Sequence, residues 1–141
     1  MTAKEYLKQL SKLECRINHK RNELSELRSR AYMLNGIDYS KEPIKSSVAY
    51  CGAHERVIDA MYQIECEILC QIRDYESKKH KIIDQIHEID NPLYESILYK
   101  RYVEFKSLEL IAVELNYSYE WIRHAHGLAL EEFRRMFLPP Q

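Results

Sequence analysis

Two pairs of residues in this sequence have the spacing of metal ligands on one face of a helix. Cys15 and His19 are four residues apart, and so are Cys66 and Cys70. Antiparallel pairing of the two segments would bring them together as a zinc site with three thiolates and one imidazole. The heptad register described below, however, turns Cys15 and His19 away from the helix–helix seam. We therefore expect free thiols, no bound metal and no cofactor.

The remaining chemistry-bearing residues form no recognisable catalytic motif. There is no Gly-rich phosphate loop, no nucleophile elbow and no carboxylate pair with an evident pocket. We therefore predict that the protein is not an enzyme. The N-terminal residues lack the apolar core of a signal peptide, and no apolar run approaches the ~20 residues of a membrane span. These features predict a soluble, cytoplasmic protein with no membrane partner.

The Cys15/His19 and Cys66/Cys70 pairs are expected to lie on long helices. Only three Gly and four Pro occur among 141 residues, which predicts an all-α fold. We expect one helix over residues 2–35, opened by a capping box of Thr2 and Glu5, and a second over residues 53–90. The linker is residues 37–52, where Pro43 and Gly52 interrupt any periodicity.

Apolar residues in both predicted helices recur at alternating gaps of mostly four and three, which is the pattern of a coiled-coil seam. Neither helix can bury its seam alone, so the pattern predicts a long antiparallel hairpin over residues 1–90, or an oligomer. The first seam comprises Ala3, Tyr6, Leu10, Leu13, Ile17, Lys20, Leu24, Leu27, Ala31 and Leu34. The second comprises Val57, Met61, Ile64, Ile68, Ile72, Tyr75, Lys79, Ile82, Ile86 and Ile89.

Charge favours pairing of the two helices with each other. Residues 1–36 carry eight Lys/Arg against four Glu, and residues 53–90 carry five Lys/Arg against nine Asp/Glu. Opposite charges on the flanks of a seam select the partner. Lys20 and Lys79 interrupt the seams. Either their stems pack while the ammonium groups reach water, or they fix the register of the two helices.

Residues 91–138 have the pattern of a helix-turn-helix domain. Asn91 and Pro92 are typical of a helix start, and the helix that follows is expected to end near Val103. A second helix is predicted over residues 108–115, and Asn116 is suited to the left-handed conformation that ends helices. Ser118 is a good N-cap for a third helix. Its predicted buried face comprises Ile122, Ala125, Ala129 and Phe133.

Residues 95–135 carry a set of side chains at the spacing of a known DNA-binding domain. They are Ile97, Leu98, Arg101, Tyr102, Leu108, Glu109, Leu110, Ile111, Ala112, Glu114, Leu115, Ser118, Ile122, Arg123, Ala129, Leu130, Phe133 and Arg134. With these residues the segment resembles the fourth domain of bacterial sigma factors. A helical hairpin followed by such a domain is similar to the ArpU/RinA-like late-gene regulators of phages and prophages. This resemblance implies a transcription regulator that binds double-stranded DNA.

The resemblance also implies which residues would contact DNA. Arg123 would bind a guanine, Glu120 would accept from a cytosine amino group, and Ser118 would bind a phosphate. The DNA-reading residues are Ser118, Tyr119, Glu120, Trp121, Arg123 and His124. The phosphate-contacting residues are Lys100, Arg101, Lys106, Arg134 and Arg135. Trp121 and Tyr119 would stack on bases or touch a thymine methyl, but Trp121 is equally well suited to the core of the domain.

The charge of this domain predicts weak DNA binding by the domain alone. Residues 91–141 carry six Lys/Arg against seven Glu, and phosphate neutralisation supplies most non-specific affinity. We therefore expect DNA binding to require a dimer formed through the hairpin, additional contacts from the basic first helix, or RNA polymerase as a partner. Two alternatives remain open. One is a DNA-packaging component such as a small terminase subunit, and the other is a structural interaction module that does not bind DNA.

Overall fold

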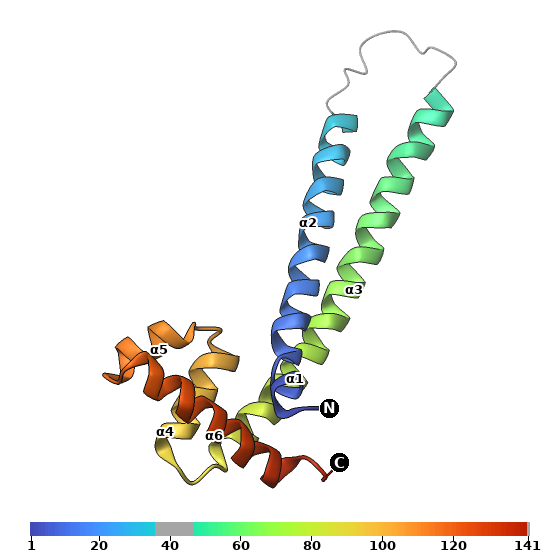
Figure 1. The fold of residues 1–141 in the computed structure, drawn as a ribbon. Coiled ribbons are helices and arrows are strands. Elements are labelled where there is room, and N and C mark those ends of the chain that lie inside the picture. The colour runs from blue at the N-terminus through green and yellow to red at the C-terminus, as the bar shows by residue number, and fades with distance from the viewer. Residues whose placement is uncertain (36–46, 141) are drawn as a thin grey trace. The chain divides into compact units, whose positions relative to one another are not determined.

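The structure, a computed structural model, describes residues 1–35 and 47–140, and all regular elements within these ranges are helices (Figure 1). The predicted all-α class is confirmed. Residues 37–46 of the predicted linker lie outside the described residues. No helix in the described ranges is long and apolar enough to cross a membrane. The elements are α1 (Ala3–Leu7), α2 (Gln9–Asn35), α3 (Ser47–His87), α4 (Pro92–Leu98), the π-helix η1 (Tyr99–Val103), α5 (Leu108–Leu115) and α6 (Tyr119–Phe137).

Two helix bounds differ from the predicted ones. The helix expected over residues 2–35 is divided at Lys8 into α1 and α2, although its Thr2–Glu5 capping box is present as predicted. The helix expected from residue 53 begins at Ser47, inside the predicted linker, and ends at His87 rather than residue 90. Gly52 does not stop it, because one glycine costs a helix only about 1 kcal/mol, which a long helix can absorb.

The chain forms two compact units. The first, which we call the terminal unit, combines Met1–Glu14 with Asp74–Gln141. The second, the hairpin unit, is Cys15–Arg73. This division differs from the boundary predicted between residues 90 and 91, because the last turns of α3 pack with the C-terminal helices.

The hairpin unit contains α2 from Cys15 onward and α3 as far as Arg73, and these two helices run antiparallel within one chain (Figure 1). Ile17 and Leu24 of α2 and Ile68 of α3 are buried, as the seam pattern predicts. Lys20 Nζ lies 3.0 Å from a carboxylate oxygen of Glu67, so this lysine pairs across the hairpin instead of only reaching water. The hydrogen bond with Glu67 raises the pKa of Lys20.

The terminal unit has a core built from both ends of its sequence. Leu7 and Leu10 pack with Ile82, Ile86 and residues of η1 and α6 in one buried cluster. The hydroxyl of Tyr6 donates a hydrogen bond of 2.9 Å to the side chain of Gln85, and the Tyr6 ring lies 5.9 Å from that of Phe133. The other buried members of the cluster are Ala3, Ile89, Leu98, Tyr102, Val103 and Ala129.

Candidate nucleic-acid interface

Three local features set the ends of α5 and α6 and the turn between them. Ser107 caps α5 by accepting a hydrogen bond of 3.3 Å from the backbone N–H of Leu110. Asn116 ends α5 in the left-handed conformation, at φ 58° and ψ 40°, which asparagine tolerates better than most residues. Ser118 then caps α6 by accepting from the N–H of Trp121 at 3.2 Å. The predicted helix-turn-helix is therefore present.

A second buried cluster fixes α6 against α5. Ile111 and Ala112 of α5 contact Ile122 and Ala125 of α6, and Ile97 of α4 completes the cluster. Ala129 and Phe133, further along α6, belong to the main core. All four residues predicted on the buried face of α6 are buried. The N-terminal turns of α6 are thus held by their inner face, and the opposite face is left to solvent.

The predicted DNA-reading side chains are exposed, and Glu120, Arg123 and His124 lie together on that outer face. Ser118, Glu120, Arg123 and His124 are exposed. Tyr119 is 42% exposed and Trp121 is 47% exposed, so Trp121 does not enter the core. The Trp121 ring lies 6.0 Å from that of His124. Arg123 forms no ion pair with any carboxylate in the described part of the chain, which leaves its guanidinium free to bind a ligand.

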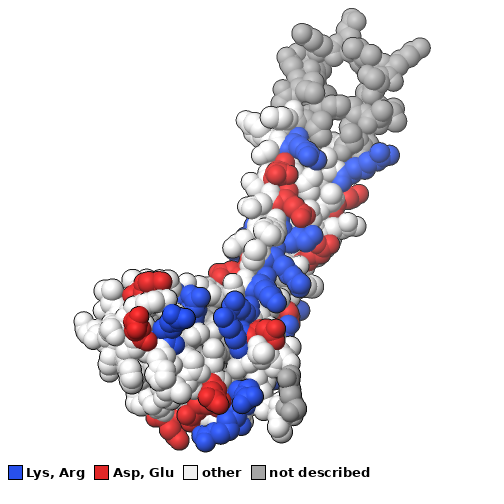
Figure 2. Space-filling view, viewed as in Figure 1, with Lys and Arg blue, Asp and Glu red and all other residues white. Residues whose placement is uncertain are grey.

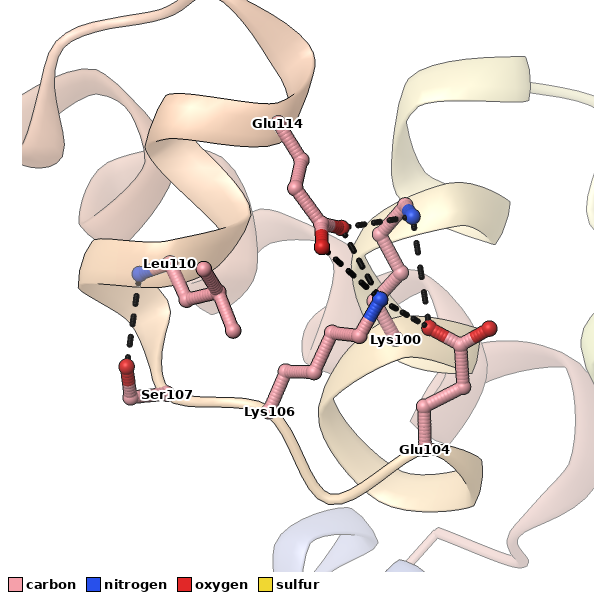
Figure 3. A network of polar contacts seen from close by, with 6 residues as sticks. All are labelled: Lys100, Glu104, Lys106, Ser107, Leu110 and Glu114. Atoms are coloured by element: carbon pink, nitrogen blue, oxygen red, sulfur yellow. Dashed lines mark hydrogen bonds and ion pairs between the residues drawn. The ribbon is translucent and has the colours of Figure 1, made fainter.

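Two of the predicted phosphate contacts are already paired with acidic residues (Figure 3). Lys100 Nζ lies 2.8 Å from the Glu114 carboxylate, and Lys106 Nζ lies 2.9 Å from the carboxylates of both Glu104 and Glu114. These contacts raise the pKa of Lys106 and lower the pKa of Glu114. The network joins η1 and the segment that follows it to α5, so the two lysines contribute little free positive charge.

The three arginines predicted to contact phosphates lie in different settings. Arg101 is half-buried and donates a hydrogen bond of 2.8 Å to the carbonyl oxygen of Lys106. Arg135 pairs with Glu132 at 3.2 Å. Arg134 is exposed and has no ion pair among the described residues. Of the five predicted contacts, Arg134 therefore offers the most available charge.

Basic residues near the N-terminus also belong to the terminal unit, which contains α6. They were not among the residues predicted to contact phosphates. Lys8 and Ser11 line a shallow pocket together with Arg101 and Phe105. Lys4 lies beside Arg134 at another depression. In the sequence, only the net positive charge of residues 1–36 indicated that lysines of this segment could contribute to DNA binding. On the face drawn in Figure 2, positive and negative side chains alternate without a large surface of one sign.

A partly buried polar pair, Tyr102 and His126, lies on the inner side of α6. The Tyr102 hydroxyl and His126 Nε2 form a hydrogen bond of 3.0 Å, and the two rings stack with centroids 5.8 Å apart. Burial lowers the pKa of His126 to about 4, and the positive charges of Arg101 and Lys4 add to the effect. Burial also raises the pKa of Tyr102 to about 12. At neutral pH the pair is therefore uncharged and serves the packing of α6 against η1.

The cysteine and histidine pairs keep their helical spacing without assembling into one site. Cys15 Sγ lies 3.5 Å from His19 Nε2 on α2, and both side chains are exposed. Cys66 and Cys70 are exposed on α3. Within the described ranges, no three His, Cys, Asp or Glu side chains gather as metal ligands would.

The structure thus shows two helices, α5 and α6, joined by a short turn and packed against α4. Comparison of the chain with models of protein families, with curated proteins and with solved structures found no match.

Proposed function

We propose that the protein is a DNA-binding transcription regulator of the phage type, as the resemblance to sigma-factor domains implies. The observation that carries the proposal is the α5–turn–α6 geometry, which holds the first turns of α6 by one face and leaves Tyr119, Trp121 and Arg123 exposed. A helix presented in this way fits the major groove of B-DNA, with its N-terminal side chains toward the base edges.

Residues outside the helix-turn-helix support the same proposal. Lys4 and Lys8 add positive charge to the unit that contains α6, where Lys100 and Lys106 are neutralised by Glu104 and Glu114. Phosphate neutralisation determines the non-specific part of DNA affinity, so affinity is expected to be modest and strongly salt-dependent. Base contacts by α6 supply the specific part.

Arg123→Ala is expected to weaken specific binding about 5- to 150-fold, because one bidentate contact to guanine contributes about 1–3 kcal/mol of discrimination. The target is first obtained by selecting bound sequences from a random DNA library with the purified protein, and affinity is then measured by gel shift. Circular dichroism should show an unchanged helix content.

The matched control for this prediction is Arg30→Ala. Arg30 is an exposed arginine of the hairpin unit and forms no ion pair with the described residues. Its removal takes away the same charge and should change specific affinity less than twofold. Equal losses in the two variants would contradict the assignment of α6 as the DNA-reading helix.

Glu114→Gln is expected to strengthen non-specific DNA binding. The change removes the carboxylate that binds both Lys100 and Lys106 and leaves Glu104 as their one acidic neighbour. The two ammonium groups then share one carboxylate in place of two, which makes them more available to phosphates. Each added phosphate contact steepens the dependence of log affinity on log salt by about 0.9. The free energy of unfolding should change little, because the pairs are on the surface, where water screens them.

Glu109→Gln on the same helix is the comparison for this effect. Glu109 is exposed and forms no ion pair within the described residues, so its loss changes the net charge without releasing a lysine. The salt dependence of Glu109→Gln should match the native protein. A slope for Glu114→Gln equal to that of Glu109→Gln would mean that the two lysines do not reach DNA.

Binding of a partner protein is the second candidate function, favoured by exposed apolar side chains on α5. Leu110 and Val113 are exposed on this helix, and Tyr117 is exposed in the turn that follows. The resemblance to sigma-factor domains makes RNA polymerase the first partner to test. If the protein binds no DNA at low salt, where phosphate contacts are strongest, but binds RNA polymerase, this second function would replace the first.

A further inference from the structure

Gly127 lies near the middle of α6, on the exposed side of the helix. A glycine is unfavourable there, because it loses more backbone freedom on folding than any other residue. Replacement of a mid-helix glycine by alanine shifts the folding equilibrium about four- to fivefold toward the folded state. The position of Gly127 therefore indicates a role other than helix stability.

The fold of the described chain supplies neither of the usual structural reasons for a glycine. Gly127 does not have positive φ, so its backbone conformation is one that any residue adopts. Beyond its two chain neighbours and the adjoining backbone of α6, a β-carbon at this position would meet no described atom within 4 Å. The missing side chain thus leaves room for a molecule other than the described chain itself.

The open space at Gly127 adjoins the predicted DNA-reading residues. Gly127 follows Arg123 by four residues and His124 by three, so the three share one face of α6 about one turn apart. Together with Glu120 they line one shallow depression. Side chains of a helix lean toward its N-terminus, so a side chain at position 127 would lie over the turn that carries Arg123 and His124. Glycine leaves that turn uncovered.

The dimensions of the major groove make this clearance important. An α-helix with its side chains is about 10–12 Å across, and the major groove of B-DNA is about 12 Å wide and about 8.5 Å deep. A helix therefore nearly fills the groove, and the side chains beside the reading residues determine how close its axis comes to the base edges. At Gly127 that limit is set by the backbone itself, whose Cα atoms lie only about 2.3 Å from the helix axis.

We propose that Gly127 is a positioning residue, whose missing side chain lets the first turns of α6 sit deep enough in the major groove for Arg123 to reach the base edges. The inference rests on the proposed DNA-binding function and adds to it the side from which DNA approaches α6. DNA then faces the strip formed by Glu120, Arg123 and Gly127. A larger residue at position 127 would hold the helix away from the bases, although it would stabilise the helix itself.

Gly127→Ala and Gly127→Leu test the role of the missing side chain. Alanine and leucine both form helices well, so both variants should resist urea better than the native chain. Binding to the selected DNA target, measured by gel shift, should nevertheless weaken about fivefold with alanine and about 100-fold with leucine, because overfilling a close contact costs more with each added group. Binding to unrelated DNA depends mainly on phosphate neutralisation and should change less than about threefold.

Ser77→Ala and Ser77→Leu are the matched controls. Ser77 is exposed on α3 in the same unit as α6, and the two substitutions enlarge or stabilise a helix without touching the reading face. They should leave both DNA affinities unchanged. Equal weakening by Gly127→Ala and Gly127→Leu would overturn the proposal, because it would mean that a stiffer helix, and not the size of the side chain, reduces binding.

A double-mutant cycle with Arg123→Ala tests whether Gly127 acts through Arg123. If Gly127→Leu already keeps Arg123 from the bases, adding Arg123→Ala should weaken specific binding by less than about threefold more. Losses that simply multiply, or native affinity of Gly127→Leu, would overturn the role of Gly127 and leave the DNA-binding function intact. A native chain that binds no DNA at low salt would overturn the proposed function and this inference together.

Discussion

Replacement of Leu7 and Leu10 together by alanine is expected to unfold the terminal unit under conditions where the native chain is folded. Both side chains are fully buried, and they pack in the cluster that contains Ile82, Ile86 and Phe133. Each truncation of a buried leucine costs about 2–5 kcal/mol. Two of them approach the 5–15 kcal/mol that stabilises a typical domain.

Hydrogen exchange of the α6 backbone amides measures this loss. In the native protein the amides near Ala129 and Phe133 should be protected, and in the double variant they should exchange at rates close to those of an unfolded chain. Leu24→Ala is the control, because Leu24 is buried in the hairpin unit and makes no part of the main core. Retained protection of α6 in the double variant would mean that residues 91–138 fold as an independent domain.

Acidification from pH 6.5 to pH 4 is expected to destabilise the native chain through His126. Its folded pKa of about 4 lies below the ordinary value of 6.5, so in this interval the unfolded chain binds a proton that the folded chain does not. The contribution of neutral His126 to the free energy of unfolding is complete above pH 6.5 and is lost as the pH falls toward 4. A shift of this size corresponds to about 3 kcal/mol for a fully buried group. Because His126 is only partly buried and water screens its charge, we expect about 1–2 kcal/mol.

His126→Gln separates this effect from the titration of carboxylates. Glutamine can keep a hydrogen bond to the Tyr102 hydroxyl but binds no proton in this range. Urea unfolding at several pH values should show a smaller loss between pH 6.5 and 4 in this variant than in the native chain. His124→Gln removes an exposed histidine from the same helix and should behave like the native chain. If the free energy of unfolding fell equally with pH in all three proteins, protonation of His126 would not be the cause of the loss.

The local features of the fold were predictable because they depend on neighbouring residues. Ser118 caps α6 through an N–H only three positions away, and Asn116 ends α5 through its own tolerance of positive φ. The buried face of α6 was predictable for a related reason. Ile122, Ala125, Ala129 and Phe133 follow helical spacing, which requires no knowledge of what covers them.

The features that depend on distant residues were not predictable from the sequence. Tyr6 and Gln85 are 79 positions apart, and no local pattern indicates that they would meet. The same limit applies to the candidate interface. Lys100 and Lys106 were predicted to contact phosphate because they are basic and lie near the turn. Their pairing with Glu114 depends on how η1 packs against α5, so only the structure reveals how little of their charge is free.

The construction of the terminal unit from two separate segments has a consequence for folding during synthesis. Leu7 and Leu10 leave the ribosome well before α6, and at about 5–20 residues per second the delay is roughly 5–25 s. The hairpin unit lies wholly between the two segments and can pair its helices during this interval. The leucines, in contrast, have no α6 to cover them until Phe133 has been made. The nascent chain therefore displays a short apolar segment that a chaperone can bind, and the completion of α6 ends that exposure.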